Sequence, residues 1–146
     1  MHYQTGEPMP AELVQKIKKA ATFNEGFKTT EYLASALMDM KFHTVDPTGI
    51  DPQKFEAETL AALHMPKEIP MRHRTTQFGH IFSGEGYSAG YYGYMWSEVL
   101  TADASEAFAE APGGFYDKDV ARKLVDHLFS VRAAVDPADA YLLFRG

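Results

Sequence analysis

The sequence predicts an all-α fold of about six helices. Apolar residues recur every three or four positions along most of the chain, which is the spacing of an amphipathic helix. No segment of useful length alternates apolar and polar residues, so no strand is predicted. Asp–Pro pairs and Gly/Pro clusters separate the helical stretches, as start and stop signals do. A length of 146 residues corresponds to one domain or to part of a longer chain, and we expect a single helical domain over 1–146.

Three helices are predicted in the first part of the chain. Two prolines open the first helix, which is expected over 11–23. Asn24 can cap a second helix, expected over 25–43. A glycine and two prolines then break the pattern. Asp51, followed by proline, is typical of the N-cap of a third helix, expected over 52–64.

An irregular segment, 65–86, separates the third helix from the rest. It ends in the glycine-rich run Ser83-Gly-Glu-Gly86. A loop of this length in a compact domain is either functional or poorly ordered. A fourth helix is expected over 87–110, ending before a Pro-Gly-Gly break. Asp117 caps a fifth helix that runs to about Arg132, and a short sixth begins at an Asp–Pro pair.

Composition excludes several classes of protein. Lys and Arg number 14 against 20 Asp and Glu, for a net charge of −6, which argues against a nucleic-acid partner because such binding relies on cationic side chains. No apolar run approaches the ~20 residues that span a bilayer, and no leader peptide is visible. The chain has no cysteine, which excludes disulfides, thiolate metal sites and cysteine nucleophiles. We therefore expect a cytoplasmic protein with no membrane or nucleic-acid partner.

The chain carries no complete catalytic motif. None of the 6 histidines forms the helical His-Glu-x-x-His zinc motif, and there is neither a P-loop nor a Gly-x-Ser-x-Gly elbow. No metal site is predicted within these residues.

The most unusual feature is a row of tyrosines in the expected fourth helix. At 100° per residue, Tyr87, Tyr91, Tyr94 and Glu98 fall within about 60° of one another. Such a stripe commonly packs in a core or an interface. It can also donate hydrogen bonds to a developing oxyanion. A glycine-rich loop and His80 lie directly before the stripe, and they favour the second interpretation.

These residues resemble a known family. The runs Phe78-Gly-His80 and Tyr87-x-x-x-Tyr91-Tyr92-Gly93-Tyr94-x-Trp96, with the glycine loop between them, resemble the C-terminal catalytic region of the thimet oligopeptidase family of zinc metallopeptidases. The resemblance covers essentially the whole chain. Its flanking matches are Thr5-Gly-Glu-Pro8, Phe23-Asn24-x-Gly26-Phe27, Glu31-Tyr32-Leu33-Ala34 and Leu143-Phe144-Arg145-Gly146.

The resemblance assigns roles to individual residues. It implies that Tyr94 stabilises the oxyanion and that Tyr87 and His80 face the zinc across the cleft, where they bind the substrate backbone and the tetrahedral intermediate. It also implies that Tyr91 contributes to the substrate site. We expect Gly84 and Gly86 to bind substrate as well.

The same resemblance implies what the chain is part of. The family's zinc ligands lie upstream of the matching region, so the chain resembles the last fifth of a full-length zinc peptidase that hydrolyses short peptides. Without those ligands the chain alone is expected to hold no zinc and to be inactive. The alternative is a stand-alone helical module for binding or oligomerisation. Surfaces that meet the missing part would be exposed, among them the tyrosine stripe, Phe78 and Ile81–Phe82, so a two-fold homodimer is also expected.

Overall fold

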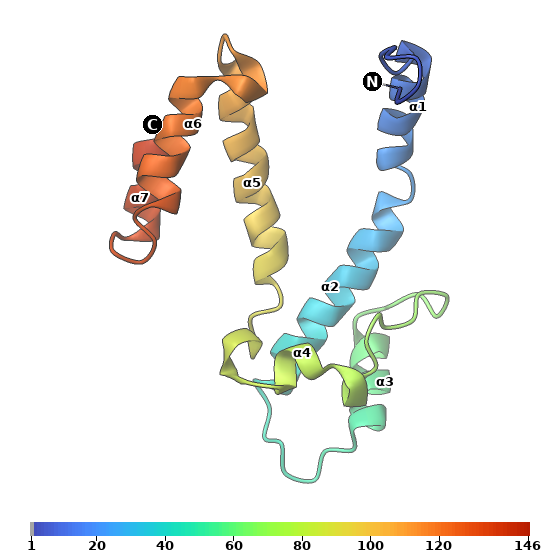
Figure 1. Ribbon diagram of the computed structural model, residues 1–146. Coiled ribbons are helices and arrows are strands. Elements are labelled where there is room, and N and C mark those ends of the chain that lie inside the picture. The colour runs from blue at the N-terminus through green and yellow to red at the C-terminus, as the bar shows by residue number, and fades with distance from the viewer. Residues whose placement is uncertain (1) are drawn as a thin grey trace. The chain divides into compact units, whose positions relative to one another are not determined.

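A computed structural model describes residues 2–146 of the chain (Figure 1). Within these residues every regular element is helical and no strand occurs, which confirms the all-α prediction. The chain divides into two compact units, of which the first ends at Tyr92 and the second runs from Gly93 to Gly146. Whether 1–146 forms a single domain stays a prediction. No helix within 2–146 combines the length and the apolar character that crossing a membrane requires.

The first unit contains the three helices predicted for it. They end one or two residues earlier than expected: α1 is Ala11–Ala21, α2 is Glu25–Phe42 and α3 is Pro52–Ala62. The segment predicted to be irregular holds three short turns of helix. These are the 3-10 turn η1 (Thr75–Gln77), the single-turn helix α4 (Gly79–Phe82) and the 3-10 turn η2 (Glu85–Tyr87).

The helix starts follow two different mechanisms. The Asp51 carboxylate accepts hydrogen bonds from the backbone N–H groups of Gln53 and Lys54, both at 2.9 Å, as an N-cap does. Asn24 precedes α2 as predicted, but its side chain makes no capping bond. Its φ of +61° lies in the left-handed region, which asparagine tolerates better than most residues. Asn24 therefore marks the boundary by turning the chain.

The core of the first unit forms where the 65–92 segment packs on α2. One cluster joins Ala36, Phe78, Ile81 and Tyr91, with Tyr32 beside it. Phe78 and Ile81 are only 1% and 0% exposed, so the prediction that they lie on an exposed surface is wrong, because they pack against α2. Phe82, by contrast, is exposed. A second cluster joins Ala34, Met38 and Met71, with Phe42, Phe55, Leu60 and Met65 around it.

The second unit consists of α5 (Gly93–Glu110), the 3-10 turn η3 (Gly114–Tyr116), α6 (Lys118–Leu124) and α7 (Pro137–Arg145). The fifth helix, predicted to run to about Arg132, ends earlier: a π-helical segment, η4 (Val125–Phe129), continues α6, and residues 130–132 form a turn. Figure 1 shows α6 and α7 alongside each other, and the two helices are in contact.

A polar network joins α7 to α5. The Tyr141 hydroxyl donates to the Asp103 carboxylate at 2.7 Å, and Arg145 pairs with Asp103 and Glu110 at 3.2 and 2.9 Å. Burial, together with the hydrogen bond to Asp103, raises the pKa of Tyr141 to about 12.

Candidate functional site

The predicted tyrosine stripe does not form as one helical face. Helix α5 begins at Gly93, whereas Tyr87 ends the 3-10 turn η2 and Tyr91 lies in the following turn. Only Tyr94 of the three belongs to an α-helix, so the prediction of a helix from residue 87 is wrong. The cause is a buried carboxylate that lies far away in the sequence.

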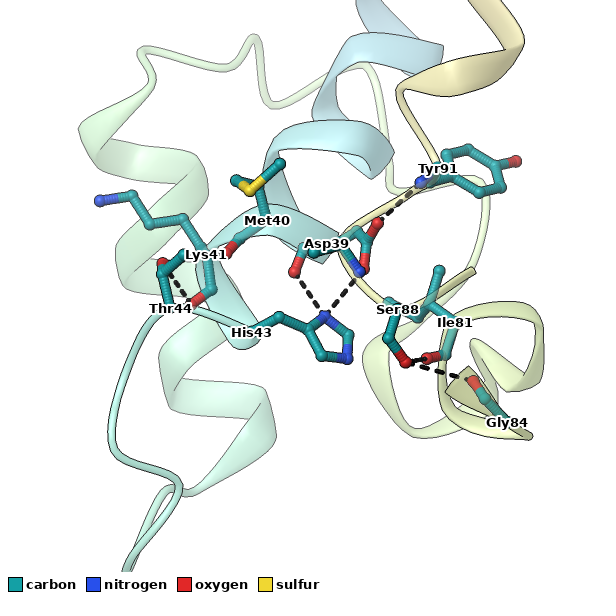
Figure 2. Close-up of polar contacts among 10 residues, drawn as sticks. Asp39, Met40, Lys41, His43, Thr44, Ile81, Gly84, Ser88 and Tyr91 are labelled. Carbon is teal, nitrogen blue, oxygen red and sulfur yellow. Dashed lines mark hydrogen bonds and ion pairs between the residues drawn. The ribbon is translucent and has the colours of Figure 1, made fainter. Parts of the chain in front are cut away.

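Asp39, near the end of α2, holds the backbone of this turn (Figure 2). Its two carboxylate oxygens accept hydrogen bonds from the backbone N–H groups of Ala89 and Tyr91, each at 2.9 Å. Ala89 has a φ of +56°, in the left-handed region that an α-helix cannot contain. The helix therefore cannot extend back through residue 89.

His43 completes the surroundings of this carboxylate. Its Nδ1 lies 2.8 Å from the Asp39 main-chain oxygen and 2.9 Å from Asp39 Oδ1, as Figure 2 shows. A carbonyl oxygen only accepts, so we assign the proton to Nδ1, which donates to both oxygens. The Asp39 side chain is 1% exposed. Three N–H donors thus satisfy a carboxylate that would be costly to bury without partners.

Tyr91 is the centre of an aromatic and polar cluster. The Tyr32 hydroxyl donates to the Tyr91 carbonyl at 2.6 Å, and the two rings stack with centroids 5.5 Å apart. Phe78 meets the Tyr91 ring edge-on at 5.0 Å. A hydrogen bond with the Tyr91 side chain, and another with Glu31, raise the pKa of the Arg72 guanidinium above its usual value. Tyr91 is buried, so its main role within this unit is to hold the cluster together, and its contribution to substrate binding stays a prediction.

His80 and Tyr87 form the accessible part of the site. Their ring centroids lie 4.3 Å apart, and the His80 ring also meets Tyr91 edge-on at 5.7 Å. Both His80 and Tyr87 are exposed. They border a hollow of about 390 Å³ whose other lining residues are Gly79, Ser83, Gly84 and Gly86. The structure therefore brings together four of the residues predicted for the site: His80, Gly84, Gly86 and Tyr87.

The glycines of the hollow are not required by the backbone. Gly84 is extended, and a Cβ added at either Gly84 or Gly86 would meet no atom within 4 Å. A side chain at either position would stand beside the hollow without disturbing the fold. The Ser88 hydroxyl lies 3.2 Å from the carbonyl oxygens of both Ile81 and Gly84, and so joins the two ends of this segment.

Glu56 of α3 holds the segment that leads into the site. Its carboxylate accepts hydrogen bonds from Arg74 Nη1 at 2.8 Å, from the Thr75 N–H at 2.9 Å and from the Thr75 hydroxyl at 2.7 Å. Burial raises the pKa of the Glu56 carboxyl, but the hydrogen bonds from Thr75 and Arg74 outweigh it, and the pKa lies below its usual value.

Tyr94 lies in the other unit, at the start of α5, and the residue is 42% exposed. Its role as an oxyanion donor stays a prediction. Among residues 2–146 no three His, Asp or Glu side chains come close enough together to hold a metal ion, so we assign no metal ligand in this part of the chain.

Sequence reasoning missed Asp39, His43 and Glu56. One signal was present for the first two. Asp39 stands in an otherwise apolar stretch of α2, and a histidine follows it four residues later, one helical turn away. A charged residue on an apolar helix face has to find a buried partner. Nothing near Glu56 in the sequence distinguishes it from Glu58, which is exposed.

Comparison with known proteins identifies the class of protein to which this site belongs. The family model described as Peptidase family M3 matches residues 1–146. The chain belongs to this family, and the resemblance seen in the sequence is confirmed.

Among its relatives are two enzymes named dipeptidyl carboxypeptidase. The one from Salmonella typhimurium is 35% identical over 99% of this chain, and the one from Escherichia coli is 43% identical over 77% of it. Oligopeptidase A of Escherichia coli is 31% identical over 99% of the chain. The alignments cover 21%, 17% and 21% of these relatives, so the chain spans about a fifth of their length.

Proposed function

We propose that this chain is the substrate-binding and transition-state-stabilising part of a zinc peptidase that hydrolyses short peptides in the cytoplasm. Family membership and the names of the relatives support a peptidase. The observation that carries the proposal is the His80–Tyr87 pair, 4.3 Å apart at the edge of a hollow lined by glycines.

The chemistry of the pair suits a peptide undergoing hydrolysis. Attack on a peptide carbonyl places negative charge on its oxygen. Hydrogen-bond donors fixed in advance around that oxygen stabilise the transition state. A phenol O–H and an imidazole N–H are both donors. Because Gly84 and Gly86 carry no side chains, a peptide backbone can approach the two rings closely. We propose Tyr94 as a further oxyanion donor, on the resemblance alone.

Zinc and the general base belong to the rest of the longer protein in this proposal. The described residues offer no cluster of metal ligands. What this chain supplies is the binding and orientation of the peptide and the donors to the oxyanion.

The test uses the intact enzyme with a short, internally quenched peptide as substrate. Tyr87→Phe removes the phenol donor and should lower kcat by roughly 10²–10³ with little change in KM. Tyr92→Phe is the matched control, because Tyr92 is exposed and lies outside the hollow. A Tyr87→Phe enzyme with the kcat of wild type would contradict the proposed role. An intact protein that hydrolyses no peptide would instead favour a stand-alone binding or oligomerisation module.

A further inference from the structure

We propose that Asp39, oriented by His43, is a positioning residue for the peptidase reaction, because it sets the turn that places Tyr87 and Tyr91 against His80. The proposal rests on the proposed function. Asp39 is not among the residues that line the hollow, so it would act through the backbone of the turn at 88–92, to which it is hydrogen-bonded.

The Asp39 carboxylate is divided between two backbone amides. Oδ1 accepts from the N–H of Ala89 and Oδ2 from the N–H of Tyr91, each at 2.9 Å. The two N–H groups bracket Gly90, so a rigid, planar carboxylate fixes how residues 89 and 91 are oriented to each other. Because the carboxylate is buried in α2, it also fixes both of them relative to that helix.

The bonds to Asp39 also prevent a different conformation of this segment. The pattern of residues 87–110 predicts a helix from Tyr87 onward, whereas α5 begins only at Gly93. Ala89 stands instead in the left-handed region, which is unfavourable for an alanine. The bonds to Asp39 hold this unfavourable residue in place. Without them the local sequence favours a longer α5, in which Tyr87 would leave the side of His80.

His43 orients the Asp39 carboxylate. Its Nδ1–H bridges the main-chain oxygen and Oδ1 of Asp39, so the imidazole fixes the orientation of the carboxylate about its own side chain. The ring also lies 5.6 Å from that of Phe82, in the helix α4 that carries His80. His43 therefore links the carboxylate to the element on the other side of the hollow.

Both tyrosines depend on this turn. Tyr87 precedes it and Tyr91 lies within it, and the centroids of their rings lie 4.3 and 5.7 Å from that of His80. A turn that relaxes would move both rings away from the imidazole at once. The expected consequence is weaker stabilisation of the transition state, with ground-state binding of the peptide largely retained.

The experiment uses the intact enzyme and two readouts. The first is hydrogen exchange at the amides of residues 89 and 91, resolved to single residues by mass spectrometry. The second is the ratio between the affinities for a phosphinic peptide, whose tetrahedral oxyanion mimics the transition state, and for the corresponding product peptide. This ratio does not depend on the fraction of enzyme that is folded, so a merely destabilising change leaves it unaltered.

Two substitutions isolate the carboxylate and its donor. Asp39→Asn keeps the size of the side chain but leaves one oxygen to serve two amides. It should expose both amides to exchange and lower the affinity ratio at least tenfold. His43→Gln keeps an N–H donor, so its affinity ratio should stay close to that of the wild type. Methionine has a similar length but no donor, so the affinity ratio of His43→Met should fall. Asp46→Asn is the control, because Asp46 bonds the backbone of Thr48 in an exposed loop away from the hollow, and it should change neither readout.

Three results would overturn the proposal. Rapid exchange at both amides in the wild type would show that Asp39 does not hold the turn. An unchanged affinity ratio in Asp39→Asn, with protection lost, would show that the turn does not position the site. Equal ratios for His43→Gln and His43→Met would remove His43 from the proposal. If the intact wild type hydrolyses no peptide, the proposed function fails and so does the positioning role, while hydrogen exchange still decides whether Asp39 holds the turn.

Discussion

Removal of the Glu56 carboxylate should destabilise the first unit locally, because this side chain ties α3 to the segment that leads into the site. Glu56→Gln is the smallest change that does so. The two carboxylate oxygens receive three hydrogen bonds, two from Thr75 and one from Arg74. A glutamine offers one acceptor oxygen, so it keeps either the bonds from Thr75 or the bond from Arg74, but not both. The bonds that remain are made to a neutral oxygen.

The magnitude follows from the burial of each partner. The Arg74 side chain is 73% exposed, so water replaces its bond at a cost of about 0–1 kcal/mol. Thr75 is buried, and its N–H and hydroxyl each exchange a charge-assisted hydrogen bond for a neutral one, which is worth roughly half as much. We expect a total of about 1.5–4 kcal/mol for Glu56→Gln. Glu56→Met leaves both Thr75 donors unsatisfied and should cost about 2–5 kcal/mol.

Native-state hydrogen exchange in α3 and at residues 75–78 is the appropriate assay, because a chain of two units need not unfold in one transition. Glu58→Gln in the same helix is the control. Glu58 is exposed and 3.9 Å from Lys54, so it should change the free energy of local opening by less than about 0.5 kcal/mol. Equal effects of Glu56→Gln and Glu58→Gln would refute the reasoning.

The comparison of the wild type with Glu56→Gln also predicts how the free energy of local opening depends on pH. The pKa of Glu56 in the folded chain is below its ordinary value of 4.5, so the unfolded chain takes up the proton first as the pH falls. The advantage of the wild type over Glu56→Gln should therefore be complete above pH 4.5 and disappear as the pH falls through the lower, folded value. An advantage that persists far into acid would show that the charge of Glu56 is not its source.

Further predictions concern Tyr94, the binding of zinc, self-association of the chain, and Tyr141 in the second unit. In the intact enzyme Tyr94→Phe should lower kcat by about 10²–10³ with little change in KM, and a near-normal kcat would exclude Tyr94 as the oxyanion donor. The chain alone should hold no stoichiometric zinc and cleave no peptide, whereas one tightly bound zinc with chelator-sensitive activity would contradict this. Exposed side chains such as Trp96 should drive self-association of the chain alone into a two-fold dimer, and light scattering across a dilution series that finds a strict monomer would reject it. Burial and the hydrogen bond to Asp103 raise the pKa of Tyr141 to about 12, so Tyr141→Phe should remove a phenol that titrates near pH 12 in an absorbance titration. An unchanged titration curve would count against that hydrogen bond in solution.

Signals that act over a few residues made most of the fold predictable. Asp51, Asp117 and Asp136 each accept a hydrogen bond from an N–H two residues ahead, so the sequence alone marks the starts of α3, α6 and α7. The apolar spacing identified the length of α2 almost to its last residue.

Features that depend on contacts between residues far apart in the sequence were not predictable. The start of α5 depends on Asp39, which lies 50 residues before Ala89, and no local pattern points to that pairing. The burial of Phe78 and Ile81 was also missed, because these residues were expected to meet the missing part of the longer protein, whereas they pack against α2. The grouping of His80 with Tyr87 was expected from the resemblance. The spacing of the residues predicted a helical face that does not exist.

The hydrogen bond from Ser88 to Ile81 joins the two ends of the 82–87 segment, and this has a consequence for how related sequences diverge. Ser88 bonds back to Ile81 while Asp39 fixes the residues that follow, so the anchoring of the segment does not depend on its length. Each doubling of a flexible loop costs only about 0.6 kcal/mol in closure entropy. Insertions and deletions beside Gly84 and Gly86 therefore carry a small entropic cost and reshape the hollow, while Ser88 and Asp39 keep the residues after the segment in place. This is a position where evolution, or a directed library, can vary the lining of the hollow one residue at a time.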